Sequence, residues 1–211
     1  MISTSLRVAS MAALAMSLSL VSVASTAQVS RATADQAAKK VASTVCVACH
    51  GPTGVSTSPL FPRLAGQTEV YLVAQLKAFK GKARGEQDAH DYMWGMATLL
   101  EDSVIEGLAR YYSSQKPAPG TPGDPKLIER GKFLFEHGDS QREIVACSSC
   151  HGQMAEGNSI FPRLASQHAA YVVRQLDVIQ KRFRESPVMH GVIKELDPDS
   201  MRAVAEYVQS R

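Results

Sequence analysis

The stretch Cys46-Val47-Ala48-Cys49-His50 decides the fold, and its pattern returns in the second half of the chain as Cys147-Ser148-Ser149-Cys150-His151. These two C-x-x-C-H motifs use all four cysteines of the 211-residue chain. Two thiols three positions apart lie on one helical turn, where both can bond the vinyl groups of one haem. The histidine that follows then lies under the iron and supplies its proximal ligand. The motifs therefore predict two covalently attached haem c groups, bonded through Cys46, Cys49, Cys147 and Cys150, with His50 and His151 on the irons.

Three other uses of paired cysteines stay open as alternatives. Disulfide bonds in an exported protein would use the four thiols but would give neither histidine a role. A thioredoxin-like redox site needs a βαβ context, which the pattern around the motifs lacks. Zinc-binding pairs normally stand about 15 to 20 residues apart, whereas these pairs lie in different halves of the chain.

The repeat extends beyond the cysteines. Phe61-Pro62-Arg63-Leu64-Ala65 recurs as Phe161-Pro162-Arg163-Leu164-Ala165, and a later block aligns Met93 with Met189. A stretch rich in proline and glycine separates the two copies, and such a composition favours a semi-rigid linker. We therefore expect domains at 28–115 and 126–211, joined by a linker at 116–125.

Both copies show helical periodicity, and no convincing period-two run appears. Asp197 followed by Pro198 is typical of a helix N-terminus. Helices are also expected before each cysteine motif, over 35–45 and 125–135. The apolar positions that recur at helical spacing in both copies are Leu72, Leu76 and Phe79 with Val172, Leu176 and Ile179, and Ile105, Leu108, Ala109 and Tyr112 with Met201, Val204, Ala205 and Val208. The predicted class is all-α, with two small domains whose cores would be marginal unless a haem filled each centre.

The N-terminal segment has the features of a signal peptide. Residues 1–27 carry a single charge, Arg7, then an apolar stretch, then small residues at Ser25-Thr26-Ala27 that fit a signal peptidase site. The apolar stretch is shorter than the roughly 20 residues that a membrane span needs. We expect cleavage before Gln28 and export of the mature chain, with an uncleaved anchor as the alternative. The formal net charge of +3 is too small to indicate nucleic acid as a partner.

The repeat also indicates a second axial ligand for each iron. Met93 and Met189 occupy matching positions, and a neutral thioether favours ferrous iron and raises the potential. A methionine can instead be an ordinary core residue. Met96 is a competitor in the first copy, while ligation by His90 or His190 would break the symmetry, because their counterparts are Ser186 and Trp94.

With these motifs the chain resembles the dihaem class I cytochromes c of the cytochrome c4 family over essentially its whole mature length. Tyr-x-x-x-Gln-Leu at 71–76 and 171–176 adds to the likeness. The resemblance implies two tandem class I domains, each wrapped around a covalent haem and related by a pseudo-twofold axis. It also implies that the carbonyls of Pro62 and Pro162 accept the Nδ1–H of the proximal histidines. One departure is that Gly131 and Phe135 in the first helix of the second copy have no evident counterparts in the first copy.

The function that the resemblance implies is transfer of single electrons between periplasmic respiratory partners, towards a membrane-bound terminal oxidase and with peripheral association with the inner membrane. Such a protein is a carrier and catalyses no bond chemistry. The alternative is an electron-transfer subunit of a periplasmic dehydrogenase, such as one that oxidises sulfide or thiosulfate. A dihaem peroxidase fits less well, because the chain is short and a methionine-ligated iron leaves no position for peroxide.

Overall fold

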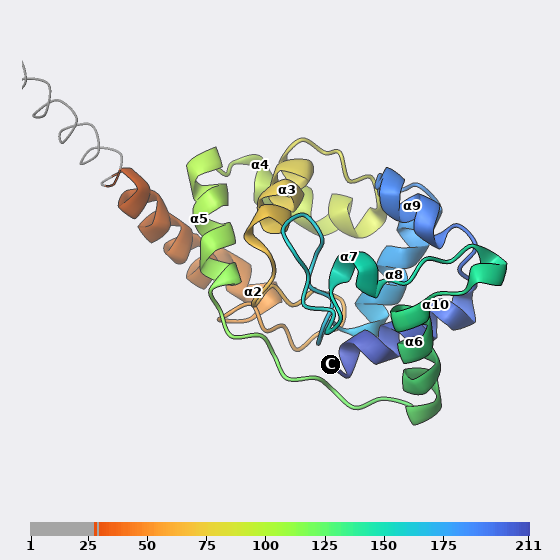
Figure 1. Cartoon of the computed structure of the whole chain (residues 1–211). Helices are drawn as coiled ribbons and strands as arrows, with labels where there is room; N and C mark the ends of the chain where they lie inside the picture. The colour runs from red at the N-terminus through yellow and green to blue at the C-terminus, as the bar shows by residue number, and fades with distance from the viewer. Residues whose placement is uncertain (1–27, 29) are drawn as a thin grey trace, which may run out of the picture.

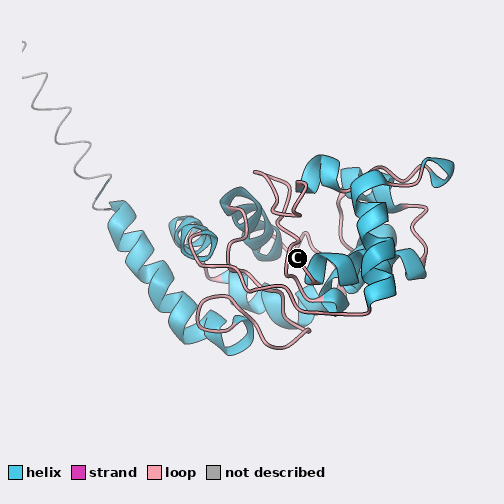
Figure 2. Cartoon of the chain, turned by 60° about the horizontal axis from the view of Figure 1, so that its bottom comes forward, coloured by secondary structure: helices cyan, strands magenta, loops and turns pink. Residues whose placement is uncertain are grey.

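The computed structural model describes residue 28 and residues 30–211, so the expected signal peptide lies outside the described residues. Helices joined by long loops form the described chain, and the helices gather into two groups that follow one another in the sequence (Figures 1 and 2). We call residues 30–113 the first half and residues 125–211 the second half. Within the described residues there is no β-strand, only isolated β-bridges. The all-α prediction is therefore confirmed.

The first half begins with a helix over 30–41 that runs on through a π-helical turn into the first cysteine motif. This continuous run lies beside the last helix of the half (Figure 1). The bounds of its elements are η1 (Ala42–Cys46), α2 (Val47–His50), α3 (Glu69–Lys80), η2 (Ala89–Met93), α4 (Trp94–Thr98) and α5 (Asp102–Ser113).

The second half repeats this order with a break before its motif. The first helix ends at His137, and Gly138, whose φ of 70° suits a glycine, starts a turn that leads to the second motif. Asp197 caps the last helix by accepting from the N–H of Ser200, as the Asp-Pro pair predicts. The bounds are α6 (Pro125–His137), η3 (Ser140–Arg142), α7 (Ser148–His151), α8 (Ala169–Gln180), α9 (Pro187–Ile193) and α10 (Pro198–Gln209).

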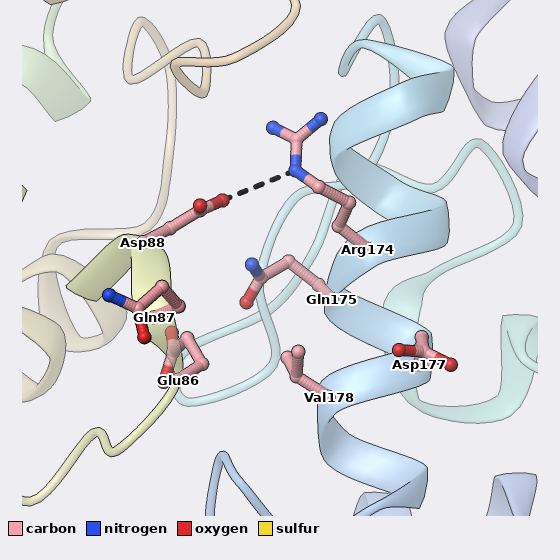
Figure 3. Close-up of a pocket in the computed structure, with 7 residues that line it drawn as sticks. All are labelled: Glu86, Gln87, Asp88, Arg174, Gln175, Asp177 and Val178. Carbon is pink, nitrogen blue, oxygen red and sulfur yellow. Dashed lines mark hydrogen bonds and ion pairs between the residues drawn. The ribbon is translucent and has the colours of Figure 1, made fainter. Parts of the chain in front are cut away.

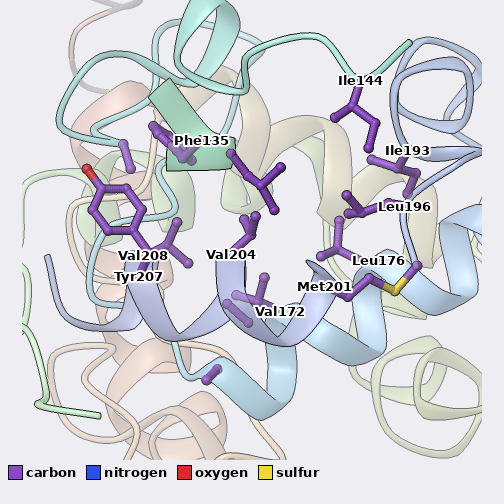
Figure 4. Close-up of a cluster of buried hydrophobic side chains, with 14 of the residues drawn as sticks. Phe135, Ile144, Val172, Leu176, Ile193, Leu196, Met201, Val204, Tyr207 and Val208 are labelled. Carbon is purple, nitrogen blue, oxygen red and sulfur yellow. The ribbon is translucent and has the colours of Figure 1, made fainter. Parts of the chain in front are cut away.

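Each half has its own apolar core. The predicted stripes of both halves face these cores, and of their members only Leu76 is not fully buried. In the second half most of the packed side chains come from α6, α8, α9 and α10, and connecting segments add others such as Ile144 and Leu196 (Figure 4). No cluster of buried apolar residues in the described chain includes members of both halves. The two cores are therefore separate.

The departure noted at the first helix has a structural explanation. In the second half, Gly131 of α6 lies under the backbone of Ala203 in α10, where a Cβ would overlap the Ala203 carbonyl. In the first half the glycine is Gly107 on the last helix, and the small residue opposite is Ala38 on the first helix. Both halves thus make the same close helix crossing, with the glycine on opposite partners.

The connecting segment, residues 114–124, runs from α5 to α6 along one side of the molecule (Figure 1). Pro117 packs against Gly66 of the first half, and the N–H of Thr121 donates to the carbonyl of Gln209 at 2.9 Å. Pro125, expected at the end of the linker, is the first residue of α6, and Asp124 is its N-cap. Across the described part of the chain, every helix is too short or too polar to pass through a lipid bilayer.

Candidate haem sites

Each cysteine motif ends in a one-turn helix that presents its histidine to the interior. His50 closes α2 and His151 closes α7, and their exposed fractions are only 6% and 4%. Burial lowers the pKa of both imidazoles, so each ring is neutral near pH 7. A neutral imidazole is the form that can bind a metal through a ring nitrogen.

A proline carbonyl fixes the orientation of each histidine ring. The Nδ1 of His50 donates to the carbonyl of Pro62 at 2.9 Å, and the Nδ1 of His151 donates to the carbonyl of Pro162 at the same distance. This confirms the contacts that the resemblance implies. With Nδ1 carrying the proton, Nε2 has a free lone pair, and no described residue forms a hydrogen bond with the buried Nε2 of His151.

The four cysteines are partly buried and do not form disulfides. Burial raises the pKa of Cys147 to about 11, and burial also raises the pKa of Cys46. Within the described residues, no group of three or more His, Cys, Asp or Glu side chains gathers as a metal site would require. The arrangement therefore gives no support to the disulfide and zinc alternatives.

The structure separates the two candidate methionines of the first half. Met93 ends η2 and packs against a small core cluster that contains Phe79, Ala89 and Ala97. Met96 is not among the residues packed against that cluster, and 55% of its surface is exposed. In the second half, Met189 lies in α9 and packs against the apolar core of that half, the main core cluster, which Figure 4 draws. The two methionines aligned by the repeat thus occupy matching, partly buried places.

The competing histidines have other partners. His90 is exposed, and its Nδ1 lies 2.9 Å from a carboxylate oxygen of Asp91. Its ring also stacks edge-on with Trp94. His190 lies beside α8, where its Nδ1 is 3.3 Å from the carbonyl of Ile179. Neither position is matched by a histidine in the other half.

Two glutamines that the repeat marks as identical join the halves. The side-chain amide of Gln67 binds the backbone of Arg163, donating to its carbonyl at 2.9 Å and accepting from its N–H at 2.7 Å. Gln167 binds the backbone of Arg63 in the same way, at 3.0 Å and 2.9 Å. The sequence predicted neither contact, because the identity of the glutamines does not show that they point across the molecule. These paired contacts give the junction its pseudo-twofold character.

A second cluster at the junction consists of buried charges and amides. Arg184 donates to the hydroxyl of Tyr71 at 2.7 Å, and Arg84 donates to the carboxylate of Glu86 at 2.7 Å. Burial would raise the pKa of Tyr71, but the positive charges of Arg184 and Arg84 outweigh burial and hold that pKa below its ordinary value. The side-chain oxygens of Gln75 and Gln175 accept from both arginines. Glu86 stands two residues after Arg84, whereas Ser186 stands two residues after Arg184.

A hollow of about 160 Å³ also opens at this junction (Figure 3). An ion pair of 3.2 Å between Asp88 and Arg174 spans it. Its lining residues come from the segment just before η2 and from α8: Glu86, Gln87, Asp88, Arg174, Gln175, Asp177 and Val178. The hollow is therefore part of the contact between the halves, away from both cysteine motifs.

The residues of each half fit a covalently attached haem. A porphyrin needs two free thiols on one helical turn and a neutral imidazole with an available nitrogen, and both halves supply them. The Nε atoms of Arg63 and Arg163 are buried and have no hydrogen-bond partner in the part of the chain that the structure describes, so they can donate to a haem carboxylate. Both arginines directly follow the prolines that orient the histidines. The donor set thus agrees with the predicted haem at both sites.

Comparison with known proteins gives the same result. The family model for cytochrome c matches residues 36–116. The cytochrome c4 of Thiocapsa roseopersicina is 38% identical over 180 residues, covering 82% of this chain and 91% of the relative. The solved structure of Acidithiobacillus ferrooxidans cytochrome c4 has a TM-score of 0.75 at 38% identity, covering 79% of this chain and 98% of that chain. A protein of Thiomonas intermedia named thiosulfate dehydrogenase electron acceptor is 35% identical over 175 residues, covering 79% of this chain and 78% of the relative.

Proposed function

Because this chain belongs to the cytochrome c4 family, a family of dihaem electron carriers, we propose that it moves single electrons between periplasmic respiratory partners, towards a membrane-bound terminal oxidase. It is an electron-transfer protein and not an enzyme. Its cofactors are two covalently bound haem c groups, which supply two one-electron iron couples when bound. The protein contributes attachment, axial ligation and exclusion of water.

We assign the attachment roles to the motifs themselves. Cys46 and Cys49 would bond the first haem, and Cys147 and Cys150 the second. The Nε2 atoms of His50 and His151 would be the proximal ligands, since the bonds from Nδ1 to the proline carbonyls leave these nitrogens free. Holding each ring in one orientation keeps the ligand in place in both oxidation states, which limits reorganisation during electron transfer.

For the opposite side of each iron we assign Met93 and Met189. Their packing against the core clusters supports this choice, and the exposure of Met96 argues against it as a ligand. A thioether on both irons favours the ferrous state and gives a relatively high potential. An iron with two strong axial ligands has no open position, which suits a carrier of electrons.

The observation that carries this proposal is the pair of buried, neutral histidines, each oriented by a proline carbonyl and preceded by unpaired thiols. Mass spectrometry of the denatured, mature protein tests it, with the expected mass being that of the polypeptide plus two haems. Extraction with acidified acetone should remove neither haem. A mass that shows no haem or one haem contradicts the proposal.

The periplasm is the proposed location, since the N-terminal sequence has the features of an export signal. Fractionation of the producing cells tests it, because the haem protein should leave the cell with the periplasmic fraction. Retention in the membrane pellet at high salt would favour the uncleaved anchor. Recovery from that pellet by salt would instead indicate peripheral association with the inner membrane.

A second candidate is an electron-transfer subunit of a periplasmic dehydrogenase that oxidises sulfide or thiosulfate. The similarity to the Thiomonas intermedia protein favours this candidate. Purification from the native source at low salt separates the two roles. A dehydrogenase recovered in constant ratio with the cytochrome would support the subunit role, and a cytochrome free of other chains would support the independent carrier.

A further inference from the structure

One peptide group in each half makes a hydrogen bond through its carbonyl and another through its N–H. The carbonyl of Pro62 accepts from the Nδ1 of His50 at 2.9 Å. The N–H of the same peptide group belongs to Arg63, and it donates to the Oε1 of Gln167 in the other half at 2.9 Å. A single amide therefore connects the proximal histidine of the first half to a side chain of the second half.

The second half contains the equivalent series of hydrogen bonds. The carbonyl of Pro162 accepts from the Nδ1 of His151 at 2.9 Å, and the N–H of Arg163 donates to the Oε1 of Gln67 at 2.7 Å. The connection is therefore crossed: Gln167 of the second half connects to His50 of the first half, and Gln67 of the first half connects to His151 of the second half.

Both glutamine amides are held in one orientation. Each Nε2 donates to the carbonyl of the arginine in the other half. Each Oε1 also accepts from the backbone N–H of the residue that follows the glutamine, at 2.9 Å for Gln67 and 3.1 Å for Gln167. Only 7% of either glutamine is exposed, so water competes little for these bonds. The acceptor oxygen thus stands ready in front of the arginine N–H.

Hydrogen bonds in series polarise one another. When the N–H of a peptide group donates, its carbonyl becomes a better acceptor, so the bond from the histidine Nδ1–H becomes stronger. A histidine whose Nδ1–H is drawn to an acceptor is a more basic ligand, and a more basic ligand favours ferric iron. The oxygen of each glutamine should therefore lower the potential of the iron in the opposite half.

We propose that Gln167 tunes the haem of the first half and Gln67 tunes the haem of the second half, each acting through the Pro–Arg peptide group that holds the proximal histidine. This inference rests on the proposed haem ligation by His50 and His151. The glutamines are positioning residues and touch neither haem iron. Through them, the potential of each haem depends on how the two halves are docked.

The test compares Gln167→Leu with its mirror variant Gln67→Leu in the intact dihaem protein. Labelling the histidines with ¹⁵N gives the Nδ1–H resonances of His50 and His151 in the diamagnetic, reduced state, and a redox titration gives the potentials of both haems. Gln167→Leu should shift the His50 resonance upfield and the potential of the first haem to more positive values. Gln67→Leu should do the same to His151 and the second haem.

The crossed pattern is what a purely structural role would not produce. Changes confined to the half that carries the substitution, equal changes in both halves, or no change in either would overturn the inference. If the Leu variant does not fold, Gln167→Glu replaces it, because a carboxylate keeps an oxygen in front of the Arg63 N–H. That variant should keep the His50 resonance at or downfield of its original position, and an upfield shift there overturns the inference.

Failure of the proposed function would be recognised separately. A protein that lacks one or both haems by mass would contradict the haem sites themselves. A protein with two haems and normal histidine ligation, but without the crossed shifts, would contradict only the tuning by the glutamines.

Discussion

Gly107 lies against Ala38 so closely that a Cβ at position 107 would stand 2.7 Å from the Cβ of Ala38. The second half builds the same crossing of its first and last helices with Gly131 opposite Ala203. Each crossing therefore tolerates one small side chain and one glycine, but the two halves place the glycine on different helices.

Gly107→Ala should destabilise the first half by about 1 to 3 kcal/mol, because the helices must move apart to admit the methyl group. Denaturant unfolding followed by circular dichroism measures this loss. The double variant Ala38→Gly/Gly107→Ala recreates the arrangement of the second half and should recover part of the loss. A double variant no more stable than Gly107→Ala would show that the crossing does not explain the effect.

Gly95 provides a matched control for that substitution. It lies in α4, and a Cβ there would meet no atom of the described residues within 4 Å. Gly95→Ala should stabilise the protein by about 0.5 to 1 kcal/mol, since alanine loses less backbone entropy than glycine in a helix. Destabilisation by both alanine variants would point to a general sensitivity to glycine replacement.

The distal ligands give a prediction about spectra. Met93→Ala should open the first iron to water or an added ligand and remove one of two sulfur-to-iron charge-transfer bands in the far red. Met96→Ala is the control and should leave both bands, because its side chain is exposed. Met189→His should keep a low-spin spectrum but lower the potential of the second haem, since imidazole is the stronger donor.

The reverse effect of the two alanine variants would show that Met93 is not the ligand of the first iron. If Met96→Ala removes the band and Met93→Ala does not, Met96 is the ligand and the helix around it must rearrange. The second half would be unaffected by that outcome, since Met189 has no neighbouring methionine to replace it.

How far the sequence predicted the fold depends on whether a feature is local. The helices and their buried stripes followed from spacing alone, and the Asp197 cap followed from two adjacent residues. The glycine crossing of the first half did not, because the pattern was sought on the first helix while Gly107 is on the last. Packing between helices depends on which positions meet in space, and that information is not local.

The cap of the last helix gives the second half a dependence on acid. The N–H of Ser200 and the guanidinium of Arg142 both bind Asp197 and lower its pKa below the ordinary value of 3.8. A carboxylate with a lowered pKa in the folded state stabilises fully above its ordinary pKa, and this contribution is lost as the pH falls through the lowered value. Unfolding at a series of pH values below about 5 should therefore show declining stability.

Two variants at this position separate charge from capping. Asp197→Ala should cost about 1 kcal/mol at neutral pH, through loss of the cap. Asp197→Asn keeps a capping oxygen but has no charge to lose, so its stability should decline less steeply in acid. An equally steep decline in the Asn variant would assign the acid sensitivity elsewhere, with Asp139 as the next candidate, since its bond with Arg142 also lowers its pKa.

The buried cluster at the junction contains the guanidinium groups of Arg84 and Arg184 and the carboxylate of Glu86. Glu86→Ala would leave Arg84 and Arg184 buried together without a carboxylate, which should cost about 3 to 5 kcal/mol. Replacing Arg84 as well, with methionine, should restore much of the stability. Ser186→Ala, two residues after Arg184 as Glu86 is two residues after Arg84, is the control and should change stability by about 0.5 kcal/mol or less.

Separate cores lead to a prediction about the halves as independent domains. Residues 124–211 retain the Asp124 cap and the whole main core cluster. Produced with a haem-attachment system, this fragment should be a soluble, low-spin protein with one haem. A fragment that carries haem but lacks helical circular dichroism would show that the second half depends on the first.

The histidine–proline contacts beside the motifs were predicted, and the contacts at the junction were not. The cysteines, the histidines and their proline partners all lie within short stretches whose spacing carries the chemistry. Gln67, Gln167, Arg84 and Arg184 act on the opposite half, and only the arrangement of the two copies brings them to their partners. The repeat showed that Gln67 and Gln167 are identical residues at matching positions, but it could not show that their side chains bind the opposite half.

The connecting segment has a consequence for how strong the junction has to be. The halves meet through hydrogen bonds and ion pairs, and their described residues share no apolar core. Contacts of this kind between separate chains would be transient. Covalent connection raises the effective concentration of one half at the other into the millimolar range. Even a weak affinity then keeps the halves docked nearly all the time. Cleavage of the segment between Gly120 and Asp124 would turn a permanent contact into a dilution-dependent one.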